Sequence, residues 1–165
     1  MIITGKYPSL RLRRNRKYSW SRKLVEENNL SPSDLVLPIF ITEGKNKIEK
    51  IKTMPGVYRY SVNNLSKVVD NAIKLNIPMI SLFPKIRTDL KDNYGSEAIN
   101  ENNLICNAIK LIKKRYKNQI GIMCDVALDP YTKHGHDGIL KDGKILNDKT
   151  IEVLVKQSLL QAEMG

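Results

Sequence analysis

The residues best suited to chemistry lie in one short segment, Asp125–Gly138. It gathers three carboxylates, two imidazoles and a phenol, from Asp125, Asp129, Asp137, His134, His136 and Tyr131. Carboxylates suit hard cations such as Mg²⁺, which keeps several waters and needs only one or two protein oxygens. The two histidines instead favour zinc or another transition metal. The structural alternative is that the aspartates cap turns and the histidines bond the loop backbone.

Apolar patterning predicts the elements that must position this segment. Short apolar runs typical of strands buried on both faces occur at 35–41, 79–83 and 120–126. Apolar residues with helical spacing occur at 65–73, 104–112 and 151–162, and the last of these helices is expected to be capped by Asn147 or Asp148. Residues 43–61 predict a small hairpin, and residues 129–147 predict a polar loop. Pro38 counts against a central place for the first strand, because proline cannot donate a ladder hydrogen bond.

The order of strand, helix, strand, helix, strand, helix predicts an α/β fold with a parallel sheet and right-handed crossovers. A doubly wound sheet and a (β/α)₈ barrel both begin in this way, and a barrel of ~250 residues would make this chain about half of one. In both folds function gathers at the carboxyl ends of the strands, where Asp125–Gly138 lies, and this favours function over turn capping for the cluster. Lys85 also ends a strand and could form a Schiff base if desolvated, although a solvated lysine is the commoner case. Cys124 is expected to be a small buried apolar residue.

The charge of the chain is concentrated at its start. Residues 1–30 carry eight basic and two acidic groups, which is +6 of the net +11, and have few aliphatic residues. They are therefore predicted to form a basic arm that precedes a globular part at 31–165. Such an arm can bind nucleic acid, dock on a partner subunit, or reflect a general lysine excess. No apolar run approaches the ~18 residues that cross a bilayer, and no secretory signal is evident, so a cytoplasmic protein is expected.

Several blocks resemble the delta-aminolevulinic acid dehydratase (porphobilinogen synthase) family. The most specific is Asp125–Gly138 followed by 143–148, which is similar to the metal-loop signature of that family. Further blocks in the same order lie at 11–16, 20–25, 34–40, 54–59 and 81–84. The resemblance implies the N-terminal portion of a TIM (β/α)₈ barrel, with residues 31–165 as its first three β/α units. It also implies that the arm wraps a neighbouring subunit, usually in an octamer, so neither nucleic acid nor a membrane is an expected partner.

The resemblance implies a lyase (a hydro-lyase) of tetrapyrrole and heme biosynthesis, which condenses two 5-aminolevulinate molecules to porphobilinogen with loss of two waters. Asp125 matches an active-site carboxylate of the family. The three loop cysteines of zinc-dependent members correspond to Ala127, Asp129 and Asp137. Because thiolates select zinc and carboxylates select harder ions, catalytic zinc is not expected. Mg²⁺ is expected, in an allosteric or an active-site role, with Asp129 and Asp137 as its candidate ligands. Whether these two aspartates bind a metal directly or only hydrogen-bond substrate and water is left open.

The Schiff-base lysines and the substrate-carboxylate arginines of the family match no residue of this sequence, since they lie in later strands. This polypeptide alone is therefore predicted to lack dehydratase activity. The alternative hypothesis is a non-catalytic interaction module or gene relic that binds partner subunits through its basic arm.

Overall fold

The computed structural model describes residues 5–165, which leaves residues 1–4 of the predicted arm outside the described part. The chain divides into two compact units, Met1–Ser31 and Pro32–Gly165. In the first unit a 3₁₀ turn at Arg14–Arg16 precedes the short helix α1, Ser19–Leu24. Ser21 is the one buried residue of α1, and its hydroxyl donates to the Asn15 carbonyl at 2.7 Å. The described part of this unit, residues 5–31, therefore has almost no apolar interior of its own.

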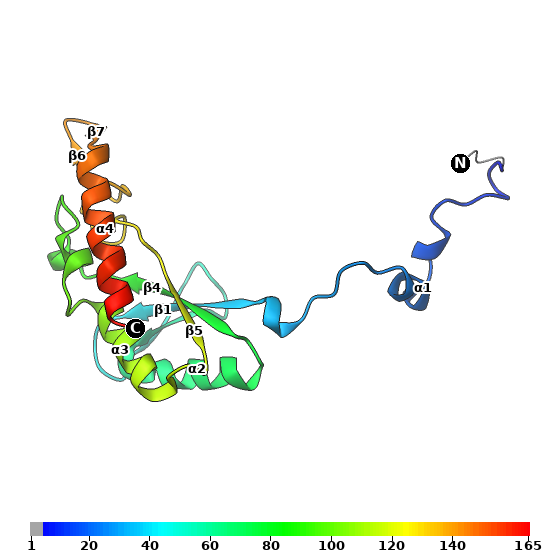
Figure 1. The fold of residues 1–165 in the computed structure, drawn as a ribbon, viewed down its shortest axis with the longest axis horizontal. Helices are drawn as coiled ribbons and strands as arrows, with labels where there is room; N and C mark the ends of the chain where they lie inside the picture. The colour runs from blue at the N-terminus through cyan, green and yellow to red at the C-terminus, as the bar shows by residue number, and fades with distance from the viewer. Residues whose placement is uncertain (1–4) are drawn as a thin grey trace. The chain divides into compact units, whose positions relative to one another are not determined.

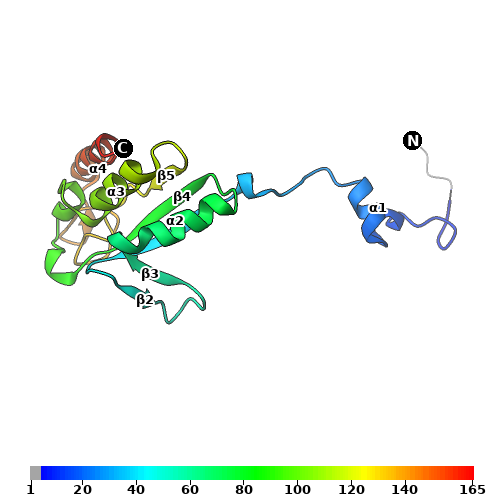
Figure 2. The ribbon, with the colours of Figure 1, turned by 90° about the horizontal axis from the view of Figure 1, so that it is seen from below.

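The second unit is built on a five-stranded sheet with the order β2-β3-β1-β4-β5 (Figure 1). The three predicted strands are confirmed as β1 (Val36–Thr42), β4 (Met79–Lys85) and β5 (Gly121–Cys124), and they pair in parallel. The predicted hairpin is confirmed as β2 (Ile48–Lys50) and β3 (Tyr58–Ser61), which pair antiparallel. The strand β3 also pairs in parallel with β1, so the hairpin extends the main sheet (Figure 2).

The three predicted helices are confirmed as α2 (Leu65–Lys74), α3 (Leu104–Tyr116) and α4 (Asn147–Glu163). The helices α2 and α3 bury their apolar sides against one face of the sheet. The strands β1 and β4 contribute fully buried residues to the same hydrophobic core, namely Ile39, Ile41, Ile80 and Leu82. The helix α3 begins at a real cap, because the Asn103 side chain accepts from the Cys106 backbone N–H at 2.8 Å. No helix in residues 5–165 is both long enough and apolar enough to cross a membrane.

Pro38 lies inside the sheet, against the expectation that it would exclude a central strand. The strand β1 pairs with β4 along its whole length but with β3 only from Phe40 onward. On one side of the strand there is consequently no ladder at Pro38 that the missing N–H could interrupt.

Two expectations for the end of the chain are wrong. The N-cap of α4 is Leu146, not Asn147 or Asp148, and the turn is closed by Thr150, whose hydroxyl donates to the Leu146 carbonyl at 2.8 Å and accepts from the Ile139 N–H at 3.0 Å. The expected buried face of α4 is only partly buried, because Ile151, Val155 and Leu159 face solvent while the polar Gln157 is fully buried.

The polar loop before α4 contains a small hairpin that was not predicted. Its strands are β6 (Leu140–Lys141) and β7 (Lys144–Ile145). Asp142 and Gly143 connect them, both with positive φ, of 49° and 75°. An Asp-Gly pair is the usual signal for this tight turn, so the sequence did contain the information.

Candidate functional site

A row of side chains that line one cavity crosses the sheet on the face opposite to α2 and α3, which we call the open face. Strand register pairs Arg59 with Phe40 and Phe40 with Phe83. Asp125 follows Cys124, the partner of Leu82, and so comes level with Phe83. Because side chains alternate along strands, this row faces away from the core residues Ile41 and Leu82. The row lies at the carboxyl ends of the parallel strands, where the functional segment was expected.

The row forms the floor of an open cavity of about 360 Å³. The rings of Phe40 and Phe83 lie 5.7 Å apart and give it an apolar floor. Its charged lining consists of Arg59, Lys85 and Lys91 together with Asp125 and Asp129. A cavity with an aromatic floor and a few polar groups of both signs is the usual form of a small-molecule site.

The structure brings the three predicted aspartates into electrostatic contact. Burial raises the pKa of the half-buried Asp129 carboxyl, and the carboxylates of Asp137 and Asp125 nearby raise it further. A proton or a cation at this position would relieve that repulsion. Within residues 5–165, no group of three or more histidine, cysteine or acidic side chains has the geometry of a metal cage. Among these residues the three aspartates therefore do not form a closed site of protein ligands.

Side chains of α4 hydrogen-bond the backbone of the segment that carries Asp125 and Asp129. The Gln157 amide donates to the Ala127 carbonyl at 3.2 Å, and the Gln161 amide donates to the Asp125 carbonyl at 3.1 Å. Gln157 is fully buried, and its Oε1 has no partner among the described residues. This pair of glutamines was not among the predicted site residues. Its only signal was two glutamines four residues apart in a helix, which places them on the same side.

The two histidines take the structural role that was considered for them. The His136 backbone N–H donates to His134 Nδ1 at 3.2 Å, and the Thr132 hydroxyl donates to the His136 carbonyl at 3.0 Å. Neither ring is part of the described lining of the cavity. These bonds shape the loop and give no support to a transition-metal site at the histidine pair.

Lys85 and Cys124 both have unreactive surroundings. The structure favours a solvated lysine over a Schiff-base lysine at position 85, and an unreactive thiol at position 124. Lys85 Nζ lies 2.6 Å from Glu49 Oε1 and the side chain is 48% exposed, so the amine is not desolvated as a Schiff-base lysine requires. Burial raises the pKa of the Cys124 thiol to about 11, which keeps it protonated at neutral pH.

Comparison with known proteins shows the family to which this chain is related. A sequence model described as delta-aminolevulinic acid dehydratase matches residues 9–165. The chain belongs to the delta-aminolevulinic acid dehydratase family. A relative from Bradyrhizobium diazoefficiens, named delta-aminolevulinic acid dehydratase, is 53% identical over 95% of this chain and 44% of its own length. A relative of the same name from Chlamydia pneumoniae is 43% identical over 95% of this chain and 47% of its own length.

A solved structure supports the fold as well as the family. The crystal structure of the Toxoplasma gondii delta-aminolevulinic acid dehydratase (porphobilinogen synthase), in complex with the reaction product porphobilinogen, is 39% identical and superposes with a TM-score of 0.88. The match covers 94% of this chain and 44% of that one. The chain therefore spans about half the length of the relatives that it matches, and its α/β fold with a mostly parallel sheet is that of a partial barrel.

Proposed function

We propose that this chain supplies one side of the active site of a porphobilinogen synthase, which condenses two 5-aminolevulinate molecules to porphobilinogen with loss of two waters. The observation that carries this proposal is the cavity on the open face, where Asp125 and Asp129 lie opposite cationic side chains at the carboxyl ends of three parallel strands. Membership of the family and the product-bound relative from Toxoplasma gondii support it.

Asp125 is the group that we assign to substrate. It lies beyond the last residue of β5, is exposed toward the cavity and has its backbone fixed by Gln161. A fixed carboxylate can accept hydrogen bonds from the ammonium group of 5-aminolevulinate and can take up or return a proton during water loss. The reactive amines come from outside this chain in our proposal, because Lys85 is exposed and paired with Glu49.

We assign a hard cation, Mg²⁺, to Asp129 and Asp137. The two carboxylates raise the proton affinity of their site, as the raised pKa of Asp129 indicates, and a divalent cation would neutralise them. The segment offers no cysteine at these positions, which disfavours zinc. When bound, Mg²⁺ would offset negative charge and hold water beside Asp125.

We also propose that the arm, residues 1–30, docks on another copy of the protein in an oligomer. Its described part exposes large apolar side chains, with Leu12, Trp20 and Leu24 each more than 60% exposed. Exposed apolar groups of this size, interleaved with arginines and lysines, are typical of a surface that is covered by a partner.

Turnover tests the proposed function. The purified chain is given 5-aminolevulinate and Mg²⁺, first alone and then together with a second polypeptide that carries the remaining part of the Bradyrhizobium diazoefficiens relative. We expect porphobilinogen only from the mixture, because Lys85, the lysine at the end of β4, is exposed and paired with Glu49. Turnover by the chain alone would contradict the predicted inactivity. A stable complex without turnover would contradict the assigned function.

A further inference from the structure

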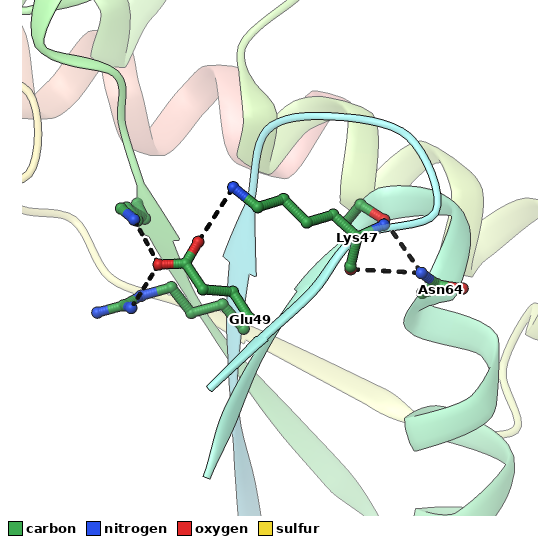
Figure 3. Close-up of polar contacts among 6 residues, drawn as sticks. Lys47, Glu49 and Asn64 are labelled. Carbon is green, nitrogen blue, oxygen red and sulfur yellow. Dashed lines mark hydrogen bonds and ion pairs between the residues drawn. The ribbon is translucent and has the colours of Figure 1, made fainter. Parts of the chain in front are cut away.

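The two ends of the open-face cavity are held in different ways. At its β3–β4 end, Arg59 and Lys85 pair with the Glu49 carboxylate, at 3.3 Å and 2.6 Å (Figure 3). At its β5 end, no ion pair among residues 5–165 involves Asp125 or Asp129. The placement of these two carboxylates therefore depends on the backbone that carries them.

Asp129 lies in a tight turn, residues 128–132, which we call the Asp129 turn. The Leu128 carbonyl closes it by accepting from the backbone N–H groups of Tyr131 and Thr132, at 2.9 Å and 3.0 Å. The side chains of Leu128, Tyr131 and Thr132 are buried, whereas Asp129 is half-buried and lines the cavity. The position of the Asp129 carboxylate is therefore set by the placement of this turn.

The loop that follows β4 pairs with the Asp129 turn through the main chain of Asp92. The Asp92 N–H donates to the Tyr131 carbonyl at 3.3 Å, and the Asp92 carbonyl accepts from the Lys133 N–H at 2.9 Å. These two bonds form an isolated parallel bridge between Asp92 and Thr132. A single residue of one loop therefore binds the main chain of the other loop on both sides of Thr132.

The Asp92 side chain orders the loop from which this main chain is presented. Its Oδ1 accepts from the backbone N–H groups of Tyr94 and Ser96, at 2.9 Å and 3.1 Å. Hydrogen bonds from backbone N–H groups to a carboxylate are charge-assisted, and an aspartate that makes them folds the chain into a turn. Burial acts to raise the pKa of Asp92, but hydrogen bonds from residues 94–96 outweigh it and lower the pKa, so the carboxylate is ionised at neutral pH.

Gly95 brings the turn made by Asp92 into close contact with the Asp129 turn. Its φ of 66° is a conformation that suits glycine, and a Cβ at this position would lie 3.2 Å from Leu128 Cδ2 and 3.6 Å from Thr132 Cγ2. The backbone of one turn therefore packs directly on the side chains of the other. A change at the Asp92 side chain is expected to reach the Asp129 turn through this packing and through the main-chain bonds.

We propose that Asp92 is a positioning residue of the candidate site, which holds the Asp129 turn against the loop after β4. Asp92 is not among the residues that line the cavity, whereas Asp129 and Lys91, the residue before Asp92, both line it. Its carboxylate orders one loop, and its main chain carries that order to the other. The role in catalysis rests on the proposed function, whereas the coupling of the two loops does not.

Hydrogen exchange at the Lys133 amide tests the coupling without turnover. Lys133 donates to the main-chain carbonyl of Asp92, which Asp92→Ala retains, so an effect at Lys133 must be transmitted through the loop. In the full chain, labelled with ¹⁵N, we expect Asp92→Ala to speed exchange at Lys133 by about tenfold or more, because charge-assisted hydrogen bonds are lost. The Leu82 amide, within the paired part of β4, should keep its rate. An unchanged rate at Lys133 would overturn the proposal.

Matched variants separate the loss of the acceptor from the loss of a charge. Asp92→Asn keeps an acceptor oxygen, and we expect it to recover most of the protection of Lys133 that Asp92→Ala loses. Asp89→Ala is the control, because it removes an exposed carboxylate of the same loop that pairs with Arg87. An equal effect of Asp89→Ala and Asp92→Ala on Lys133 would overturn the proposal.

Gly95→Ala tests the coupling from the other residue of the contact, and it also serves if Asp92→Ala does not fold. The added methyl group would press on Leu128 at a backbone conformation that disfavours alanine, so exchange at Lys133 should again become faster. A folded Gly95→Ala with wild-type exchange at Lys133 would contradict the coupling.

Turnover of the two-polypeptide mixture tests the catalytic role. We expect Asp92→Ala to lower kcat by about tenfold with a smaller change in KM, because misplaced groups slow the chemical step more than binding. Asp92→Asn should restore most of this loss. Faster exchange at Lys133 with an unchanged kcat would reject the positioning role. A wild-type mixture that forms no porphobilinogen would reject the proposed function and leave the coupling to be decided by exchange alone.

Discussion

The two faces of one sheet differ in what holds them and in what they do. On the face covered by α2 and α3, β1 and β4 present fully buried aliphatic residues such as Ile41 and Leu82. On the open face, the residues next to these in the same strands are Phe40 and Phe83, which lie with charged groups around a cavity. Successive side chains of a strand point to opposite faces of the sheet, so one strand contributes alternate residues to the core and to the cavity.

The largest expected effect is on the covered face. Leu82→Ala removes a side chain with no solvent exposure, and we expect the free energy of unfolding to fall by about 2–5 kcal/mol. Phe83→Ala, the neighbouring change on the open face, should cost less because Phe83 is only partly buried. Urea unfolding of both variants measures the difference. A larger loss for Phe83→Ala would break the distinction between the two faces.

The next effect concerns the helix that fixes the Asp125 segment. Gln157→Leu leaves the half-buried Ala127 carbonyl without its donor, and we expect a loss of about 1–3 kcal/mol. Gln161→Leu serves as the control at a more exposed position and should cost less. Hydrogen exchange should also speed up at the amides of 125–129 in the Gln157 variant. Equal stability of wild type and Gln157→Leu would show that the hydrogen bond from Gln157 to Ala127 does not stabilise the fold.

Acid should weaken the open face through Glu49. The folded-state pKa of Glu49 is about 2, below its usual value of 4.5, so folding is favoured when Glu49 is ionised. This contribution is complete above about pH 4.5 and is lost as the pH falls toward 2. Stability measured across this range should fall less steeply in Glu49→Gln than in wild type. Glu163→Gln, at the exposed end of α4, is the control for the removal of one carboxyl group.

The smallest expected effect is on the outer side of α4. Leu159 is 58% exposed, although it lies in the apolar stripe that was expected to be buried. We expect Leu159→Gln to change the free energy of unfolding by no more than about 0.5 kcal/mol. A loss of more than 2 kcal/mol in the isolated chain would mean that this side of the helix is covered.

The elements were predictable where one periodicity decided them. The strand ending at Lys85 and the helices α2 and α3 follow directly from the spacing of their aliphatic residues. The position of α4 was predictable but its orientation was not. Its apolar stripe is present in the sequence, yet the hydrogen bonds of Gln157 and Thr150 turn polar side chains inward.

Only those residues of the candidate site that lie close together in the sequence could be predicted to meet. Asp125, Asp129 and Asp137 stand within one segment, so their association could be expected from the sequence. Glu49, Arg59 and Lys85 are separated by up to 36 residues and meet through strand register. Register depends on how whole strands pair across the sheet, and the spacing of residues within one segment does not show which distant residues will meet.

The central claim is that Asp125 on the open face acts in porphobilinogen formation, and its most direct test is the turnover of the two-polypeptide mixture with Asp125→Asn. Asp142→Asn, in the β6–β7 turn, is the matched control. We predict that Asp125→Asn lowers kcat by at least about 100-fold, the range typical of a lost acid–base group, while Asp142→Asn stays within twofold of wild type. Equal kcat values for the two variants would contradict the account.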